Sequence, residues 1–166
     1  MKRRTAIIIA IATIVVVVIG FVVFYVFMNR PTPSVYVNPQ TVNEAVGQNF
    51  IVDIAVSNVK DLYGWQLWLY WNTTVLDFVN ATEGAFLKSR GETFFSGSTA
   101  GNLTLYCALL GNVSGVDGSG ILVTVEFHAK TVGNGPLHIY DTTLASFSSE
   151  EPITHNTRDG YFVVTS

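Results

Sequence analysis

The fold is decided between residues 50 and 71, where the chain reads FIVDIAVSNVKDLYGWQLWLYW. In its first half, positions 50, 52, 54 and 56 are all apolar and alternate with a mixed set that includes Asp53 and Ser57. Successive side chains of a β-strand point to opposite faces, so a period of two predicts a strand that buries one face in a core. This stretch therefore predicts β-structure.

The second half of the stretch also alternates, but both of its faces carry aromatic residues. The odd positions from 65 to 71 hold only Trp and Leu, and the even positions hold Gln66, Trp68 and Tyr70. If the odd positions face the core, these three side chains point outward. Large aromatic side chains exposed on one sheet face usually mark a contact surface. The pattern predicts a binding surface here, and the alternative is that another segment of the chain covers these side chains.

Short β-branched and aromatic runs continue outward from this stretch, separated by Gly, Asn, Asp and Pro. From residue 34 onward there is no apolar period of 3.6 residues, so helices are not expected. About nine strands of this kind fit two packed sheets, which predicts an all-β fold, a β-sandwich. The predicted strands cover residues 35–38, 50–57, 63–71, 76–81, 93–96, 103–110, 121–129, 137–140 and 161–164.

The N-terminal part has a different character. An uncharged run begins at Ala6 and ends at Met28, and 16 of its 23 residues are Ile, Val or Phe. As a helix this run would be roughly 35 Å long, enough to cross a hydrocarbon core of about 30 Å. Three basic residues at positions 2–4 precede the run and only Arg30 follows it closely. The positive-inside rule then predicts a cytoplasmic N-terminus and an extracellular C-terminal part.

Two alternatives to a membrane anchor are less favoured. A cleavable signal peptide has an apolar stretch of about 7 to 15 residues followed by small residues, whereas bulky residues end this run. A buried helix of a soluble protein rarely stays uncharged over so many turns. We therefore expect a basic cytoplasmic segment (1–5), a transmembrane signal anchor (6–28), a short linker with prolines (29–34) and the β-sandwich (35–166).

The composition excludes several classes of protein. Five basic and twelve acidic residues follow residue 30, a formal net charge of −7 that disfavours binding to nucleic acid. One cysteine, Cys107, can form no internal disulfide, and three histidines (His128, His138 and His155) are too far apart in sequence to suggest a metal site. No hydrolase, metalloprotease, phosphate-binding or EF-hand motif occurs. We expect a binding protein without cofactor, although the sequence leaves open a converging carboxylate pair of the glycosidase type.

Four Asn-x-Ser/Thr sequons lie in the part that is predicted to be extracellular. They begin at Asn72, Asn80, Asn102 and Asn112, near predicted turns or strand ends. Such sequons are acceptors for N-glycosylation in secreted or surface-exposed segments. They agree with the predicted topology and indicate glycosylation at some of these sites.

Several segments together resemble a cohesin domain of the kind found in archaeal and bacterial surface proteins. The resemblance covers nearly all of residues 35–164 and implies a nine-stranded jelly-roll sandwich. It also implies binding to dockerins, small helical modules that carry calcium, and so the attachment of proteins to scaffolds or cell surfaces, with polysaccharide breakdown as one setting. The matching segments are the strand Phe50-x-Val-x-Ile-x-Val after Gly47, residues 58–65 with Leu67-x-Leu69-x-Trp71, residues 75–79 and 83–87, residues 109–111, 115–120 and 122–127, and residues 159–163.

In cohesins one sheet face docks the partner helix, and the third strand contributes alternate residues just before a turn, which here reads Trp71-Asn72-Thr73. Counting back by twos from that turn gives Gln66, Trp68 and Tyr70 as partner-binding residues. Familiar dockerin-binding families often have polar residues there, so the aromatic pair implies a more apolar contact.

Related sandwich modules bind sugars on flat aromatic strips. Direct polysaccharide binding through Trp68, Tyr70 and Tyr63 is therefore an alternative function. A structural pilin-like subunit, whose basic leader is clipped before the apolar helix, is a third.

Overall fold

The computed structural model describes residues 14–25, 28, 31–99 and 103–166. The chain divides into two compact units, Met1–Pro31 and Thr32–Ser166. In the first unit residues 14–25 are helical, and among the residues described no helix is both long and apolar enough to cross a membrane. Part of the predicted anchor, residues 6–13 and 26–27, lies outside the described residues, so the anchor stays a prediction.

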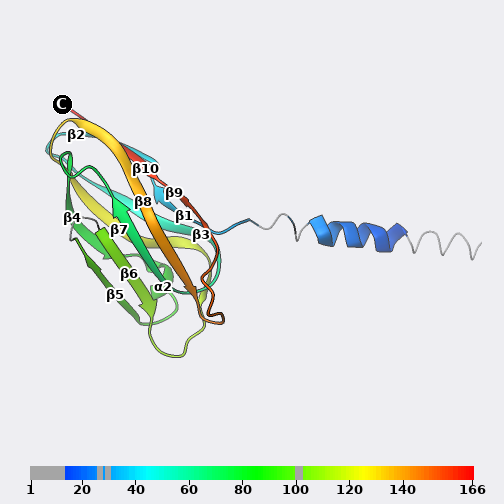
Figure 1. Ribbon diagram of the computed structural model, residues 1–166. Helices are drawn as coiled ribbons and strands as arrows, with labels where there is room; N and C mark the ends of the chain where they lie inside the picture. Colours follow the sequence, from blue (N-terminus) through cyan, green and yellow to red (C-terminus); the bar gives the residue numbers. More distant parts are fainter. Residues whose placement is uncertain (1–13, 26–27, 29–30, 100–102) are drawn as a thin grey trace, which may run out of the picture. The chain divides into compact units, whose positions relative to one another are not determined.

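The second unit is mostly β-structure, as the sequence predicts (Figure 1). Its described residues form ten strands and one short helix. The elements are β1 (Ser34–Asn38), β2 (Thr41–Ala45), β3 (Asn49–Tyr70), β4 (Leu76–Glu83), α2 (Ala85–Lys88), β5 (Thr93–Ser98), β6 (Leu103–Leu109), β7 (Val116–Ala129), β8 (Gly133–Ser146), β9 (Asn156–Arg158) and β10 (Gly160–Thr165).

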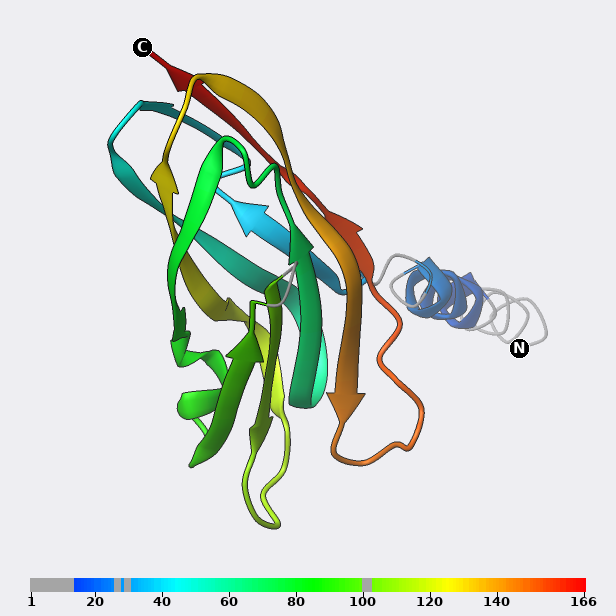
Figure 2. The same cartoon turned by 60° about the vertical axis from the view of Figure 1, so that its left-hand side comes forward.

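The strands pair in two layers, and the long strand β3 contributes to both. In the first layer the N-terminal half of β3 lies between β1 and β7, with β9 beyond β1 and β4 beyond β7. In the second layer the C-terminal half of β3 lies between β6 and β8, with β5 beyond β6, and with β10 and then β2 beyond β8. Figure 2 shows β5 and β6, in green, side by side at one end of this layer.

The prediction of two separate strands at 50–57 and 63–71 is wrong in one respect, because the structure joins them into β3. The pairing of β3 with β7 shifts register after Val56 and again after Val59. Asn58 and Asp61 have φ of 56° and 58°, in the left-handed region that Asn and Asp tolerate better than most residues. These irregular residues carry the chain from one layer to the other without ending the strand.

The side chain of Asp61 ties this crossing to two other segments. Its Oδ2 accepts hydrogen bonds from Ser146 Oγ (2.7 Å) and from Ser148 N (2.8 Å) and Oγ (2.6 Å), and its Oδ1 accepts one from Gly115 N (3.1 Å). These donors favour the charged form, with the Ser148 hydroxyl contributing most, and lower the pKa of Asp61 to about 2. The crossing is thus held by an ionised carboxylate.

Strands β2 and β9 and the helix α2 were not predicted. Each of the two strands lies at the edge of its layer and pairs on one side only among the described residues. Their sequences, TVNEA and NTR, lack the apolar alternation that marks a half-buried strand. The predicted strands 121–129 and 137–140 are also longer in the structure, where β7 and β8 begin earlier and β8 ends later.

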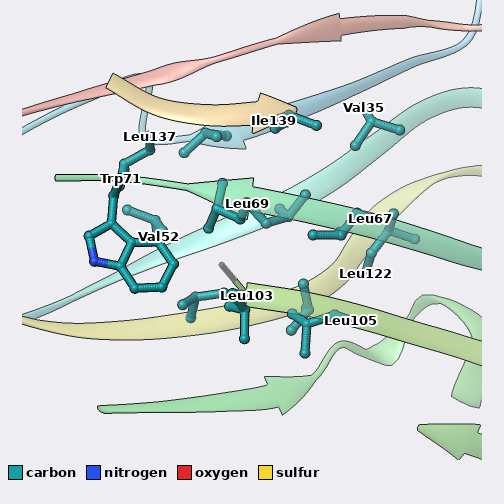
Figure 3. Close-up of a cluster of buried hydrophobic side chains, with 14 of the residues drawn as sticks. Val35, Val52, Leu67, Leu69, Trp71, Leu103, Leu105, Leu122, Leu137 and Ile139 are labelled. Atoms are coloured by element: carbon teal, nitrogen blue, oxygen red, sulfur yellow. The ribbon is translucent and has the colours of Figure 1, made fainter. Parts of the chain in front are cut away.

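The core lies between the layers and contains the apolar faces that the alternation predicts. Figure 3 shows Leu67 and Leu69 of β3, and Trp71 directly after it, among buried side chains of other strands, and each of the three is at most 5% exposed. The ring of Trp71 meets that of Phe127 edge-on, with centroids 5.0 Å apart. Its Nε1 donates to the carbonyl of Leu76 (3.1 Å), so its polar atom is satisfied inside the core.

Cys107, in β6, is a free and buried cysteine. Burial raises the pKa of its thiol to about 12, and the nearby carboxylate of Glu83 adds to that rise. A thiol held in its neutral form is a poor nucleophile. Cys107 therefore acts as a packing residue.

Candidate functional site

The outward side of the second layer carries the residues that the sequence singles out. Register pairs Gln66 with Tyr106 of β6 and with Thr143 of β8, and pairs Trp68 with Thr104 and Asp141. Residues directly opposite in paired strands project to the same side of a sheet. We call this surface the aromatic face. Its members are Phe94, Ser96 and Ser98 on β5, Thr104, Tyr106 and Ala108 on β6, Gly64, Gln66, Trp68 and Tyr70 on β3, and His138, Tyr140, Asp141, Thr143 and Ala145 on β8.

The structure brings the three predicted site residues together on the aromatic face. Gln66 and Trp68 are half-buried, and Tyr70 is 50% exposed. None of them belongs to the core cluster. Within the described part of the chain, their side chains make no hydrogen bond or ring contact, so the structure gives the Trp68 indole and the Gln66 amide no polar partner. Whether these residues bind a partner stays a prediction.

Three further aromatic residues belong to this face and were missed as site residues. Phe94 and Tyr106 are 53% and 39% exposed, and their ring centroids lie 6.0 Å apart. Tyr140 is 68% exposed and sits where the pairing of β3 with β8 shifts register. The alternation of residues 103–109 could have shown that Tyr106 points outward. That β6 and β8 flank β3 depends on long-range pairing, which no local pattern shows.

A hollow of about 450 Å³ lies on the aromatic face beside Gln66. Its floor is a row of small residues across three strands, because Gly64 pairs with Ala108 on one side and with Ala145 on the other. The adjacent row, Tyr106, Gln66 and Thr143, stands taller and forms one wall, and Phe94 forms another. The lining is mostly apolar and holds no Lys, Arg, Asp or Glu.

Tyr63, which the sequence suggests for sugar stacking, does not belong to the aromatic face. Its side chain is half-buried, its hydroxyl donates to the carbonyl of Gly111 (2.7 Å), and its ring packs against Phe147 with centroids 5.5 Å apart. Tyr63 therefore holds the loop after β6 and is not available as part of a binding strip.

The outward side of the first layer has the opposite character, and we call it the polar face. Asn49 bridges two residues of β7, since its Nδ2 donates to Glu126 Oε1 (2.9 Å) and its Oδ1 contacts His128 Nδ1 (2.7 Å). Thr124 Oγ1 donates to Asp53 Oδ1 (2.5 Å). Many polar side chains on this surface therefore have partners within the protein.

The histidines lie apart, and each contacts a different neighbour. His138 Nδ1 is 2.6 Å from Asp159 Oδ2, His155 contacts Thr142 and the carbonyl of Ile153, and His128 contacts Asn49. Among the residues that the structure describes, no group of three or more His, Cys, Asp or Glu is placed to hold a metal ion.

The sequons at Asn72, Asn80 and Asn112 begin at exposed residues, and Asn102 lies outside the described residues. Asn72 Oδ1 accepts hydrogen bonds from Thr74 N (3.0 Å) and Oγ1 (2.7 Å), which closes a turn after β3. Asn80 pairs with Glu126 and so lies on the polar face. Glycosylation of these residues stays a prediction.

Comparison with known families and structures gives a consistent result. The family described as "Cohesin domain" matches residues 35–164, and no curated protein matches the chain. A non-cellulosomal cohesin from the hyperthermophilic archaeon Archaeoglobus fulgidus has a similar structure, with TM-score 0.68, 18% identity, and coverage of 82% of this chain and 93% of that one.

Two bacterial structures extend the comparison. The OlpA cohesin in a type I cohesin–dockerin complex from Clostridium thermocellum gives TM-score 0.70, 12% identity, and coverage of 81% and 100%. A type II cohesin from the cellulosome of Acetivibrio cellulolyticus gives 0.66, 16%, and coverage of 80% and 95%. Identities this low show a shared fold.

Proposed function

The chain belongs to the cohesin domain family, and from this premise we propose that it binds a dockerin-type protein module through the aromatic face. The solved cohesins of similar structure include several that are held in complexes with dockerins. The proposal transfers that kind of partner to this chain and assigns the contact to a particular surface.

The observation that carries the proposal is the aromatic face itself. Trp68, Tyr70, Tyr106 and Phe94 lie on the outward side of the second layer, where their side chains are partly or largely exposed to water. Protein interfaces are enriched in Trp, Tyr and Phe, and these residues often supply most of the binding free energy. A partly exposed indole and an amide without internal partners are ready to donate hydrogen bonds to an incoming protein.

We also propose that the domain is displayed outside the cell by an N-terminal anchor. The support is the uncharged run from residue 6 to residue 28, the basic residues before it, and the sequons after it. Washing membranes with high salt should leave the full chain in the membrane fraction. An intact-mass measurement that places the mature N-terminus near Arg30 would contradict the anchor, and one that places it at Thr5 would favour a pilin-like subunit.

The binding proposal is tested with the full chain in detergent micelles and with dockerin modules encoded by the same genome. We expect at least one dockerin to bind in isothermal titration calorimetry. Chelation of calcium should abolish this binding through the partner's calcium loops, while circular dichroism of this chain stays unchanged. Absence of binding across the whole panel, with calcium present, would overturn the proposal.

Direct binding of a polysaccharide is the second candidate, and one feature of the structure favours it. A groove of about 570 Å³ between β8 and β9 is lined mostly by polar groups, including Asp141 and Asn156, and is bordered by the exposed ring of Tyr140. An aromatic platform beside hydrogen-bonding side chains suits a sugar ring. Retention of the chain on an insoluble polysaccharide, unaffected by chelator and lost in Tyr140→Ala, would support this function.

A further inference from the structure

A small pocket lies at the edge of the polar face, where β1 pairs with β9 (Figure 1). It has a volume of about 200 Å³ and is lined by Tyr36, Val37, Asn38, Gln40 and Arg158. We infer that this pocket binds the carboxylate group of a small acid, with Arg158 as its charged partner. The inference does not rest on dockerin binding, because the pocket and the aromatic face lie on different layers of the sandwich.

The side chains of Tyr36 and Arg158 place the pocket on the outward side of the first layer. Tyr36 lies between Val35 and Val37, which are both buried in the core, so its side chain points away from the core. Arg158 is opposite Tyr36 in the pairing of β9 with β1, and its guanidinium carbon lies 4.8 Å from the centre of the Tyr36 ring. This cation–π contact restrains a long side chain, so less conformational freedom is lost when the guanidinium binds a ligand.

The guanidinium of Arg158 has no acidic partner in the described part of the chain. Lys130, by contrast, pairs with Asp77 at 2.7 Å. Arg90 donates a hydrogen bond to the carbonyl oxygen of Ser114 (3.1 Å). Among the residues that the structure describes, the Arg158 side chain makes neither an ion pair nor a hydrogen bond, so its N–H donors are available to a ligand.

Two acidic residues adjoin the pocket, and both are bonded to other strands. Asp53 of β3 is paired with the last residue of β1, but its Oδ1 accepts a hydrogen bond from Thr124 of β7, on the side of β3 away from β9. Asp159 follows the arginine directly, but its Oδ2 lies 2.6 Å from Nδ1 of His138 on β8. Neither carboxylate forms an ion pair with the guanidinium, so the partner that suits it is an acid on another molecule.

The lining of the pocket favours a planar carboxylate over other anions. A guanidinium presents a fork of N–H groups that matches the two oxygens of a carboxylate. The side-chain amides of Asn38 and Gln40 have no hydrogen-bond partner within the described ranges and can donate to the same group. No second Lys or Arg lines the pocket, so the charge of a phosphate dianion would be only half neutralised. A free monocarboxylic acid and the acidic unit of a sugar both supply this chemistry.

The test follows binding by NMR of the isotope-labelled full chain in detergent micelles at constant ionic strength. Acetate and methyl glucuronide are the acidic probes, and acetamide and methyl glucoside are their neutral counterparts. We expect the acids to shift the Nε–H signal of Arg158 saturably, with dissociation constants on the order of millimolar, and the neutral probes to leave it unchanged. Tighter binding of the glucuronide than of acetate would identify a sugar acid as the ligand, and the reverse order would identify a free monocarboxylic acid.

Variants separate this pocket from a general effect of charge. Arg158→Gln removes the guanidinium and should weaken acetate binding, followed by the backbone amide signals of Tyr36 and Asn38, by about tenfold or more. Arg158→Lys keeps the charge but lacks the fork of donors, so its affinity should lie between those of Arg158→Gln and the wild type. Lys60→Gln is the matched control, because Lys60 is exposed and its replacement changes the net charge by the same amount. No saturable shift with either acid, or equal acetate affinity in Arg158→Gln and the wild type, would overturn the inference.

Discussion

Strand β3 contributes to both outward surfaces of the sandwich, yet the two surfaces differ in whether its side chains have hydrogen-bond partners within the protein. On the polar face, Asn49 and Asp53 of the N-terminal half of β3 hydrogen-bond to residues of β7. On the aromatic face, Gln66, Trp68 and Tyr70 of the C-terminal half have no such partners within the described residues. Both halves belong to one continuous strand, so the difference lies in the side chains that they carry.

This difference indicates which of the two faces would gain free energy if a partner covered it. Polar side chains that bond to one another in water leave little to gain from a partner, because their donors and acceptors are already used. Exposed aromatic rings keep a large apolar area in contact with water, and covering them is favourable. The aromatic face is therefore the surface that association would stabilise.

The largest effect is expected on stability, when a core residue and an outward-facing residue of β3 are compared. Leu67→Ala removes a buried side chain from the inward side of β3 and should lower the free energy of unfolding by about 2 to 5 kcal/mol. Trp68→Ala, one residue further along on the outward side, should lower it by less than about 1 kcal/mol. Chemical denaturation of the full chain measures both. If Trp68→Ala were the more destabilising variant, Trp68 would be a core residue and the proposed surface would be wrong.

The second largest effect is expected on binding affinity, which should fall for a change on the aromatic face and not for one on the polar face. Trp68→Ala should weaken dockerin binding by about 2 kcal/mol, roughly thirtyfold, because aromatic residues at the centre of an interface often contribute that much. Ile51→Ala is the matched control, since Ile51 is an apolar residue of β3 on the polar face and is 60% exposed. Calorimetric titration should give the control the affinity of the wild type. Equal losses in the two variants would mean that the faces are not distinguished by binding.

The direction of each side chain in β3 could be predicted from sequence because it follows from a local rule. Alternation alone separates Leu67 and Leu69 from Gln66 and Trp68, and the structure buries the first pair and leaves the second pair outside the core. The all-β class follows in the same way from many short apolar runs. In both cases the information lies within a few consecutive residues.

The rest of the candidate site could not be predicted, because it depends on which strands become neighbours. Tyr106 and Phe94 join Gln66 only because β6 pairs with β3 and β5 pairs with β6, which brings together residues about 30 to 40 positions apart in the chain. The row of small residues formed by Gly64, Ala108 and Ala145 likewise depends on two registers, that of β3 with β6 and that of β3 with β8. Long-range pairing is set by the packing of the whole sandwich and leaves no local signal.

A smaller effect, on the pH dependence of stability, is expected from Asp61, where β3 passes from one layer to the other. The pKa of Asp61 in the folded protein, about 2, lies below its ordinary value of 3.8, so its carboxylate stabilises the fold above about pH 4. This contribution is lost as the pH falls from about 4 to 2. Thermal unfolding over that range should show a decline in stability that is shallower in Asp61→Asn. Parallel declines in the two proteins would show that other carboxylates cause the acid sensitivity.

The smallest effect is expected from a change confined to the polar face. Asn80→Gln removes the sequon whose asparagine pairs with Glu126 on that face, so any glycan it carries would project away from the aromatic face. In a host that glycosylates the chain, the variant should lose the mass of one glycan if the site is occupied. Its affinity for a dockerin should stay that of the wild type, because nothing at Asn80 lies on the surface that binds. A clear gain or loss of affinity would show that the contact extends around the edge of the sandwich, and the division between a complete polar face and a binding aromatic face would then be too simple.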